Sequence, residues 1–165
     1  MPTPHTDDIR PPRFFEDFAV GETWESAPVS VPAEEIVAFG RSFDPQPMHT
    51  DAALAERGPF GGLVASGWHV AALSMRAFVM SGGYGRTPMV GLGIDELRWR
   101  APVRAGDTLI VRREVAELRR STSNPQHGLV RTQVTVRRQD GTVVMTLVSL
   151  GRVPTRPAEA GEART

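Results

Sequence analysis

The chain lacks two residue types that carry much of enzyme chemistry. It has no cysteine, and all 19 of its basic residues are arginine. Without cysteine there can be no disulfide, no thiolate nucleophile and no zinc or iron–sulfur centre held by sulfur. Without lysine, Schiff-base catalysis and the Walker A phosphate-binding loop are excluded as well.

An excess of charge of one sign is also missing, because 19 acidic residues balance the 19 basic ones. Nucleic-acid binders normally carry a basic surplus, so we expect no nucleic-acid partner. No apolar run approaches the ~20 residues that span a bilayer, and residues 1–12 lack the apolar region of a secretory signal. We therefore expect a cytoplasmic protein without a membrane partner.

The 165 residues fit one domain. Both ends of the chain are rich in proline, small and charged residues, and have little apolar surface to offset the entropy of ordering. We therefore predict a flexible N-terminal segment over residues 1–12 and a flexible C-terminal tail over 154–165. Residues 13–153 contain no internal repeat and no long linker, and are predicted to form the single domain.

Helical patterns dominate the first half of this domain, after a short strand predicted over 22–30. A helix is predicted over 32–42, and the spacing of Ile36, Phe39 and Phe43 gives it a buried face.

A stretch rich in proline and glycine follows over 44–63. Pro47 is expected to exclude regular helix in this stretch, apart from a short helical turn over 51–57. The next segment, 64–80, has apolar residues at helical spacing and little charge. It predicts a long helix with most of its surface buried.

The second half of the domain has the alternation typical of β-strands, over 88–101, 107–118, 128–138 and 142–152. In the first of these segments the alternation changes phase near Asp95, which predicts a β-bulge. A buried central helix followed by antiparallel strands predicts an α+β fold in which the sheet wraps around the helix.

The segment from Asp44 to His49 reads Asp-Pro-Gln-Pro-Met-His and places two titratable groups beside two prolines. Proline holds φ at about −65°, so the segment has few conformations open to it. A rigidly held carboxylate and imidazole suit general acid–base catalysis, which needs its groups positioned before the substrate arrives. The spacing also fits a simpler interpretation, in which Asp44 caps the preceding segment and His49 is a surface residue.

This segment resembles the hydratase signature of the MaoC-like dehydratases and (R)-specific enoyl-CoA hydratases, which have the hotdog fold. The signature is an aromatic residue, then Asp-x-Asn-Pro-x-His, then a small residue. Phe39 or Phe43 supplies the aromatic position, and Ala52 and Ala53 supply small residues.

The resemblance continues through 60–67, a glycine-rich entry to the long helix, and through 100–108, which contains Pro-Val-x-x-Gly-Asp. Two positions depart from the family pattern. Gln46 stands where the signature has Asn, and Ser66 precedes the helix glycine where His is frequent.

The resemblance implies a single hotdog domain that adds water reversibly to a trans-2-enoyl-CoA, giving an (R)-3-hydroxyacyl-CoA. Asp44 and His49 then form the catalytic pair that activates one water, and Gln46 and Pro47 hold their segment in position. The backbone N–H of Gly67 stabilises charge on the thioester oxygen, unless this glycine only permits tight packing of helix on sheet. No metal or organic cofactor is expected, because the thioester carbonyl already polarises the alkene.

The implied substrate is an acyl-CoA. The candidate substrate contacts are Phe43, Phe60, Ser66, Trp68 and Met75. Three arginines, Arg98, Arg100 and Arg104, are candidates for binding the coenzyme A phosphates, although a solvated sheet face explains them equally well. Because a single hotdog leaves its helix half covered and a sheet edge open, a homodimer or larger homo-oligomer is expected.

Two other functions stay open for the same fold: an acyl-CoA thioesterase, and a non-catalytic domain that binds acyl thioesters. The pair of Asp44 and His49 favours the hydratase, because neither alternative needs a second group aimed at C3. No metal site is predicted, since the His-x-Asp triplet at 49–51 recurs at 5–7 in the N-terminal segment. His69 is expected to be a packed or interfacial histidine.

Overall fold

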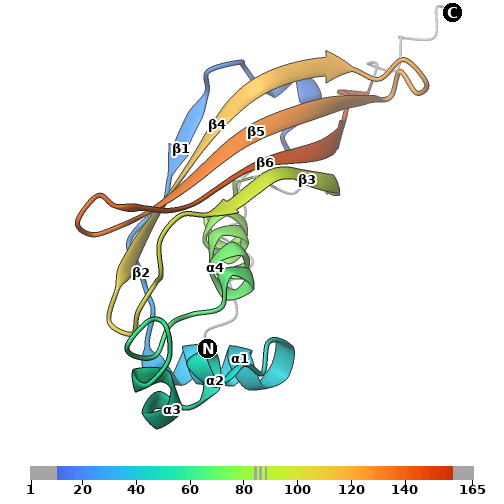
Figure 1. Ribbon diagram of the computed structural model, residues 1–165. Helices are drawn as coiled ribbons and strands as arrows, with labels where there is room; N and C mark the ends of the chain where they lie inside the picture. Colours follow the sequence, from blue (N-terminus) through green and yellow to red (C-terminus); the bar gives the residue numbers. More distant parts are fainter. Residues whose placement is uncertain (1–10, 84, 86, 88, 158–165) are drawn as a thin grey trace, which may run out of the picture.

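The computed structural model describes residues 11–157 except 84, 86 and 88, and its main feature is one curved antiparallel sheet (Figure 1). The strands follow the order β1-β4-β5-β6-β3, and β2 also pairs with β4. Their bounds are β1 Thr23–Glu25, β2 Val29–Ser30, β3 Val90–Trp99, β4 Thr108–Arg120, β5 His127–Arg138 and β6 Val143–Pro154.

The longest helix, α4, runs beneath the sheet, and the shorter helices gather near the end at which α4 begins (Figure 1). Their bounds are α1 Ala33–Phe43, α2 Pro47–Thr50, α3 Ala52–Glu56 and α4 Gly67–Met80, with a 3-10 helix at Phe15–Asp17. The predicted α+β architecture, an antiparallel sheet wrapped around a central helix, is confirmed.

The core lies between α4 and the sheet. On β5, the residues Val130, Thr132, Val134 and Val136 are all buried. The residues that alternate along this segment of the sequence therefore form the inner face of the sheet. Leu73 of α4 belongs to the same apolar cluster as Val134 and Val136.

The helix predictions need two corrections. Pro47 does not exclude helix, because it is the first residue of α2, where the N–H that proline lacks has no intrahelical acceptor. The long helix begins at Gly67 and not at residue 64, because Val64 pairs with Arg104 in an isolated β-bridge.

One side of the helical layer is open to solvent. Phe43, predicted on a buried face, exposes 75% of its surface, because in the last turn of α1 it borders two open cavities between the helices and the sheet. Trp68, Met75 and Val79 of α4 are each roughly half exposed. The prediction that most of the α4 surface is buried is therefore wrong for the single chain.

The outer strand β3 pairs with β6 alone, and nearly all of its residues are exposed, including the apolar Leu92 and Ile94. Its register with β6 shifts between Asp95 and Arg98, and Glu96 has a φ of +55°. A positive φ is uncommon for a residue other than glycine, and an irregularity of this kind is typical of a β-bulge. The bulge predicted near Asp95 is confirmed.

Residues 1–10 and 158–165 lie outside the described residues, and with them most of the two predicted flexible ends. At the C-terminal side, β6 continues to Pro154, and the backbone N–H of Arg156 donates to the Glu16 carboxylate at 2.8 Å. The ordered domain therefore extends past residue 153. In the part of the chain that the structure describes, no helix combines the length and the apolar character needed to cross a membrane.

Candidate active site

Three helix ends bring the principal polar side chains together. Asp44 is the residue that follows α1, His49 lies in α2, and Ser66 is the N-cap of α4. The Ser66 hydroxyl donates to Asp44 Oδ2 at 2.6 Å, and His49 Nε2 lies 3.3 Å from the same oxygen. The side chain of His49 is only 7% exposed and that of Asp44 is 20% exposed. The simpler interpretation of His49 as a surface residue is therefore wrong.

The orientation of the His49 ring follows from its second contact. His49 Nδ1 lies 2.8 Å from the carbonyl oxygen of Val64, which can only accept a hydrogen bond. Nδ1 must therefore carry the proton, and in the neutral ring Nε2 presents its lone pair on the side of Asp44. A basic nitrogen and a carboxylate oxygen side by side can share one water molecule.

The Asp44 carboxylate is held in its charged form. The hydrogen bond from Ser66 lowers the pKa of Asp44, and the hydrogen bond from Gln46 acts in the same direction, against burial, which raises it. When the His49 ring is protonated, its positive charge lowers the pKa further. Gln46 Nε2 donates to Asp44 Oδ1 at 2.8 Å. Gln46 thus positions Asp44 through its side chain, while Pro47 begins the helix that carries His49.

Gly40 is a positioning residue that the sequence analysis missed. It is buried in α1 where this helix meets α2, and a Cβ at residue 40 would stand 2.7 Å from the His49 carbonyl oxygen. A glycine inside a helix weakens that helix, so its presence there was a signal that something packs against the backbone.

Gly67 is the first residue of α4, and the N–H groups of a first helical turn have no intrahelical acceptor. The Trp99 ring packs directly against its α-carbon, since a Cβ at residue 67 would lie 2.2 Å from a ring atom. The packing interpretation of Gly67 is therefore correct. This packing leaves the Gly67 N–H in place, and the oxyanion role of that N–H stays a prediction.

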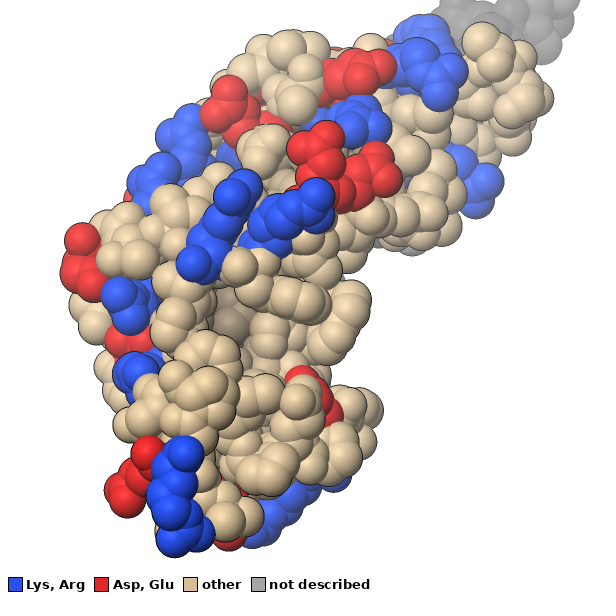
Figure 2. All heavy atoms as spheres, viewed as in Figure 1, with Lys and Arg blue, Asp and Glu red and all other residues tan. Residues whose placement is uncertain are grey.

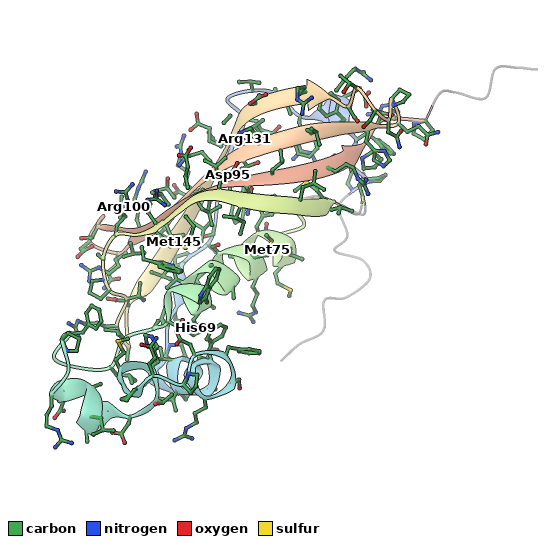
Figure 3. The ribbon with its side chains drawn as sticks, turned by 45° about the vertical axis from the view of Figure 1, so that its right-hand side comes forward. His69, Met75, Asp95, Arg100, Arg131 and Met145 are labelled. Carbon is green, nitrogen blue, oxygen red and sulfur yellow. The ribbon has the colours of Figure 1, made fainter. Side chains whose placement is uncertain are left out.

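A cavity of about 550 Å³ opens beside this cluster, and both Asp44 and His49 line it. In the space-filling view, mostly uncharged side chains surround the hollow between the sheet and the helices (Figure 2). Four of the five predicted substrate contacts line this cavity: Phe43, Phe60, Ser66 and Trp68. Met75 does not. It lines a neighbouring cavity of about 780 Å³, which Phe43 and Trp68 also border, and Figure 3 shows Met75 farther along α4 than His69.

The three candidate arginines separate in the structure. Arg100 lies at the end of β3 and lines the catalytic cavity (Figure 3). The Arg104 guanidinium donates to the Phe60 carbonyl oxygen at 2.5 Å, so it holds the loop before α4. Arg98 is exposed, and its guanidinium donates to the carbonyl oxygen of its neighbour Leu97. Neither lines the cavity, and the role of all three arginines in binding coenzyme A phosphates stays a prediction.

Ser66 lines the cavity, but its hydroxyl is engaged within the protein. Ser66 is only 1% exposed. Its hydroxyl donates to Asp44, and the same oxygen accepts a hydrogen bond from the Trp68 N–H at 3.3 Å. Ser66 therefore anchors the carboxylate to the start of α4. An N-cap hydroxyl lies over the first turn of its own helix. In this structure the first turn of α4 lies beside Asp44, the residue that follows α1.

The comparisons with known proteins agree with this geometry. The sequence profile of the MaoC-like domain matches residues 17–138. The chain belongs to the MaoC-like domain family. The crystal structure of the MaoC-like dehydratase from Rhodospirillum rubrum is 41% identical, with a TM-score of 0.79 over 88% of this chain and 99% of that one.

Two further relatives of this MaoC-like domain carry names that bear on function. The 3-hydroxybutyryl-CoA dehydratase of Methylorubrum extorquens is 36% identical over 64% of this chain, and the alignment spans 65% of the dehydratase. The R-hydratase structure from Pseudomonas aeruginosa is 26% identical, with a TM-score of 0.71 over 92% of this chain and 96% of that one. The predicted family and its hotdog fold are confirmed.

His69 behaves in this MaoC-like domain as a packed histidine. Its ring stacks on Phe39 with centroids 4.8 Å apart, and burial lowers its pKa against the opposite effect of Glu35. Among the described residues no three His, Asp or Glu side chains gather as a metal site would require.

The hydroxyl of Ser66 should control the pH dependence of the MaoC-like site. Because its hydrogen bond is the largest cause that lowers the Asp44 pKa, Ser66→Ala should raise that pKa. Asp44 then becomes protonated at a higher pH, and the acid limb of the kcat/KM profile should move upward. Ser81→Ala, which removes a hydroxyl at the opposite end of α4, is the control. An unmoved acid limb would contradict the assigned contact.

Gln46 should affect turnover more than binding. Gln46→Leu removes the hydrogen bond to Asp44, worth about 1 kcal/mol, and should lower kcat by roughly 5-fold. Gln46→Asn keeps an amide and restores the family residue, so its effect should be smaller. Steady-state kinetics of both variants decide this, and a raised KM with unchanged kcat would make Gln46 a substrate contact.

Proposed function

We propose that this MaoC-like domain catalyses reversible hydration of trans-2-enoyl-CoA to (R)-3-hydroxyacyl-CoA. The observation that carries the proposal is the pair of Asp44 Oδ2 and His49 Nε2, 3.3 Å apart at the wall of a cavity beside the first N–H of α4. The names of the Methylorubrum dehydratase and the Pseudomonas R-hydratase support the same class of reaction.

The chemistry uses only groups of this chain and one water. The Asp44–His49 pair takes a proton from the water as its oxygen bonds to C3, and the C2=C3 electrons move onto the thioester carbonyl. The Gly67 N–H stabilises the resulting oxyanion. The pair then returns a proton to C2, which completes the addition of water.

The cavity suits an apolar acyl group attached to a charged carrier. Phe43, Phe60 and Trp68 supply apolar walls, and the neighbouring cavity beyond Phe43 and Trp68 offers room for a longer chain. Arg100 stands at the cavity wall as the candidate contact for a coenzyme A phosphate.

We also propose that two copies pair through the exposed β3 edge and the open face of α4. Among the described residues one edge of β3 has no neighbouring strand, Leu92 and Ile94 on this strand are half-exposed, and Ile94 borders the same cavity as the half-exposed Met75 and Val79 of α4. A second copy would cover this surface. Sedimentation of the full chain should give at least a dimer, and a monomer at micromolar concentration would contradict this.

Incubation with crotonyl-CoA tests the proposed reaction. Hydration removes the enoyl absorbance without releasing free thiol, and chiral analysis should show the (R)-3-hydroxy product. Release of free thiol would instead support a thioesterase. Binding of crotonyl-CoA without either change would support a non-catalytic thioester-binding domain.

Removal of metal should leave this activity intact, because the thioester carbonyl polarises the alkene and the Asp44–His49 pair moves the proton. Dialysis against a strong chelator should leave kcat unchanged, with the residual metal content checked by elemental analysis. Loss of activity that returns with a stoichiometric divalent metal would overturn the cofactor-free mechanism.

A further inference from the structure

The β3 bulge determines which side chain faces the inner side of the sheet at the C-terminal end of the strand, beside the proposed active site. Before the bulge, Ile94 pairs with Ser149, and both line the cavity beneath the sheet. After the bulge, Trp99 pairs with Met145, a fully buried core residue. Because directly opposed residues share a sheet face, Trp99 lies on the inner side. In an unshifted register Arg98 would stand opposite Met145, and Trp99 would point outward.

Trp99 lies against the start of α4. The three ring atoms nearest to a Cβ built on Gly67 are Cε2, Nε1 and Cδ2, at 2.2–2.6 Å, and all belong to the five-membered ring of the indole. The face of that ring therefore covers the Gly67 α-carbon. Only glycine permits this approach, so the position of the Trp99 ring requires glycine at residue 67.

The same indole borders the reaction site. Trp99 lines the cavity together with Asp44 and His49, and its ring meets Trp68 edge to face with centroids 5.3 Å apart. Trp99 is 50% exposed, so part of its surface remains open to a ligand. An aromatic wall thus stands next to the N–H at which the proposed reaction places the thioester oxygen.

We infer that Trp99 is a specificity-determining residue that selects enoyl thioesters without a substituent at C2. The inference rests on the proposed function, in which the carbonyl oxygen meets the Gly67 N–H and C3 meets the water at Asp44 and His49. C2 lies between the Gly67 N–H and this water, and we therefore place it beside the Trp99 indole. A methyl group on C2 would need space that the Trp99 ring occupies.

The test compares crotonyl-CoA with 2-methylcrotonyl-CoA on the full chain. The wild type should prefer crotonyl-CoA, and Trp99→Leu should lower the ratio of the two kcat/KM values by roughly 10-fold or more, the usual discrimination for one methyl group. Trp24→Phe, in an aromatic contact with Phe78 away from the site, should leave the ratio unchanged. An unchanged ratio in Trp99→Leu, with native circular dichroism, would overturn the inference.

A binding measurement keeps the inference separate from the reaction itself. Saturated butyryl-CoA cannot be hydrated, and its binding should quench tryptophan fluorescence in the wild type and in Trp24→Phe. The conservative Trp99→Phe should lose a substantial part of this quenching. If crotonyl-CoA is not hydrated but this loss is seen, the proposed reaction fails while Trp99 keeps its place at the ligand. Undiminished quenching in Trp99→Phe would show that Trp99 does not contact the ligand and would overturn the inference.

Discussion

Asp44→Asn and His49→Ala should each lower kcat for crotonyl-CoA hydration by about 100-fold or more, the usual effect of losing an acid–base group. The asparagine keeps the size of the side chain but loses the negative charge that Ser66 and Gln46 stabilise. The alanine removes the ring nitrogen that lies 3.3 Å from Asp44 Oδ2. Steady-state kinetics at saturating substrate measure both losses.

Two matched substitutions separate catalysis from folding. Asp51→Asn changes an exposed aspartate two residues from His49 that caps α3, and His127→Ala changes a histidine at the start of β5, far along the chain from the site. Both should keep near-normal kcat. All four variants should retain native far-UV circular dichroism. Near-normal turnover in Asp44→Asn or His49→Ala would remove that residue from the mechanism.

Gly40→Ala should be the most damaging change outside the catalytic pair. Its Cβ would stand 2.7 Å from the His49 carbonyl oxygen and 3.0 Å from His49 Cβ, so α2 must move away from α1. Overpacking of this kind costs about 1–3 kcal/mol of unfolding free energy. Because a shift of about 1 Å at a catalytic group can cost roughly 100-fold, kcat should fall by at least about 10-fold.

The measurement has to distinguish displacement of His49 from simple instability. Kinetics well below the melting temperature should show a lowered kcat while circular dichroism stays native. Ser42→Ala, at an exposed position two residues along α1, is expected to change neither. A Gly40→Ala protein with a lower melting temperature but unchanged kcat would show that the contact between α1 and α2 does not position His49.

The sequence was sufficient where the information is local. Alternation along β5 reported the inner face of the sheet, and the phase change at Asp95 reported the bulge in β3. The signature from Asp44 to His49 identified the two groups that the fold places 3.3 Å apart. These features succeed because side-chain direction in a strand, and rigidity around proline, depend on a few neighbouring residues.

Helical spacing alone was not sufficient to predict burial. The pattern of α1 placed Phe43 on the apolar face, but this residue borders open cavities instead of packed side chains, and it is 75% exposed. The same limit applies to α4, whose apolar face is wider than the sheet that covers it. Periodicity reports which residues share a face, whereas burial depends on what lies opposite that face.

The tertiary structure alone decided how distant segments complete the site. It joined Ser66 to Asp44 across 22 positions of sequence, used Arg104 to hold the Phe60 carbonyl, and pressed Trp99 onto Gly67. These contacts depend on the ångström-scale approach of α4 to α1 and β3, and of the loop after β3 to the loop before α4. The sequence spacing of the residues does not encode these distances. The sequence by itself therefore determined the fold class and the two residues of the proposed acid–base pair, while packing between elements decided which side chains contact that pair.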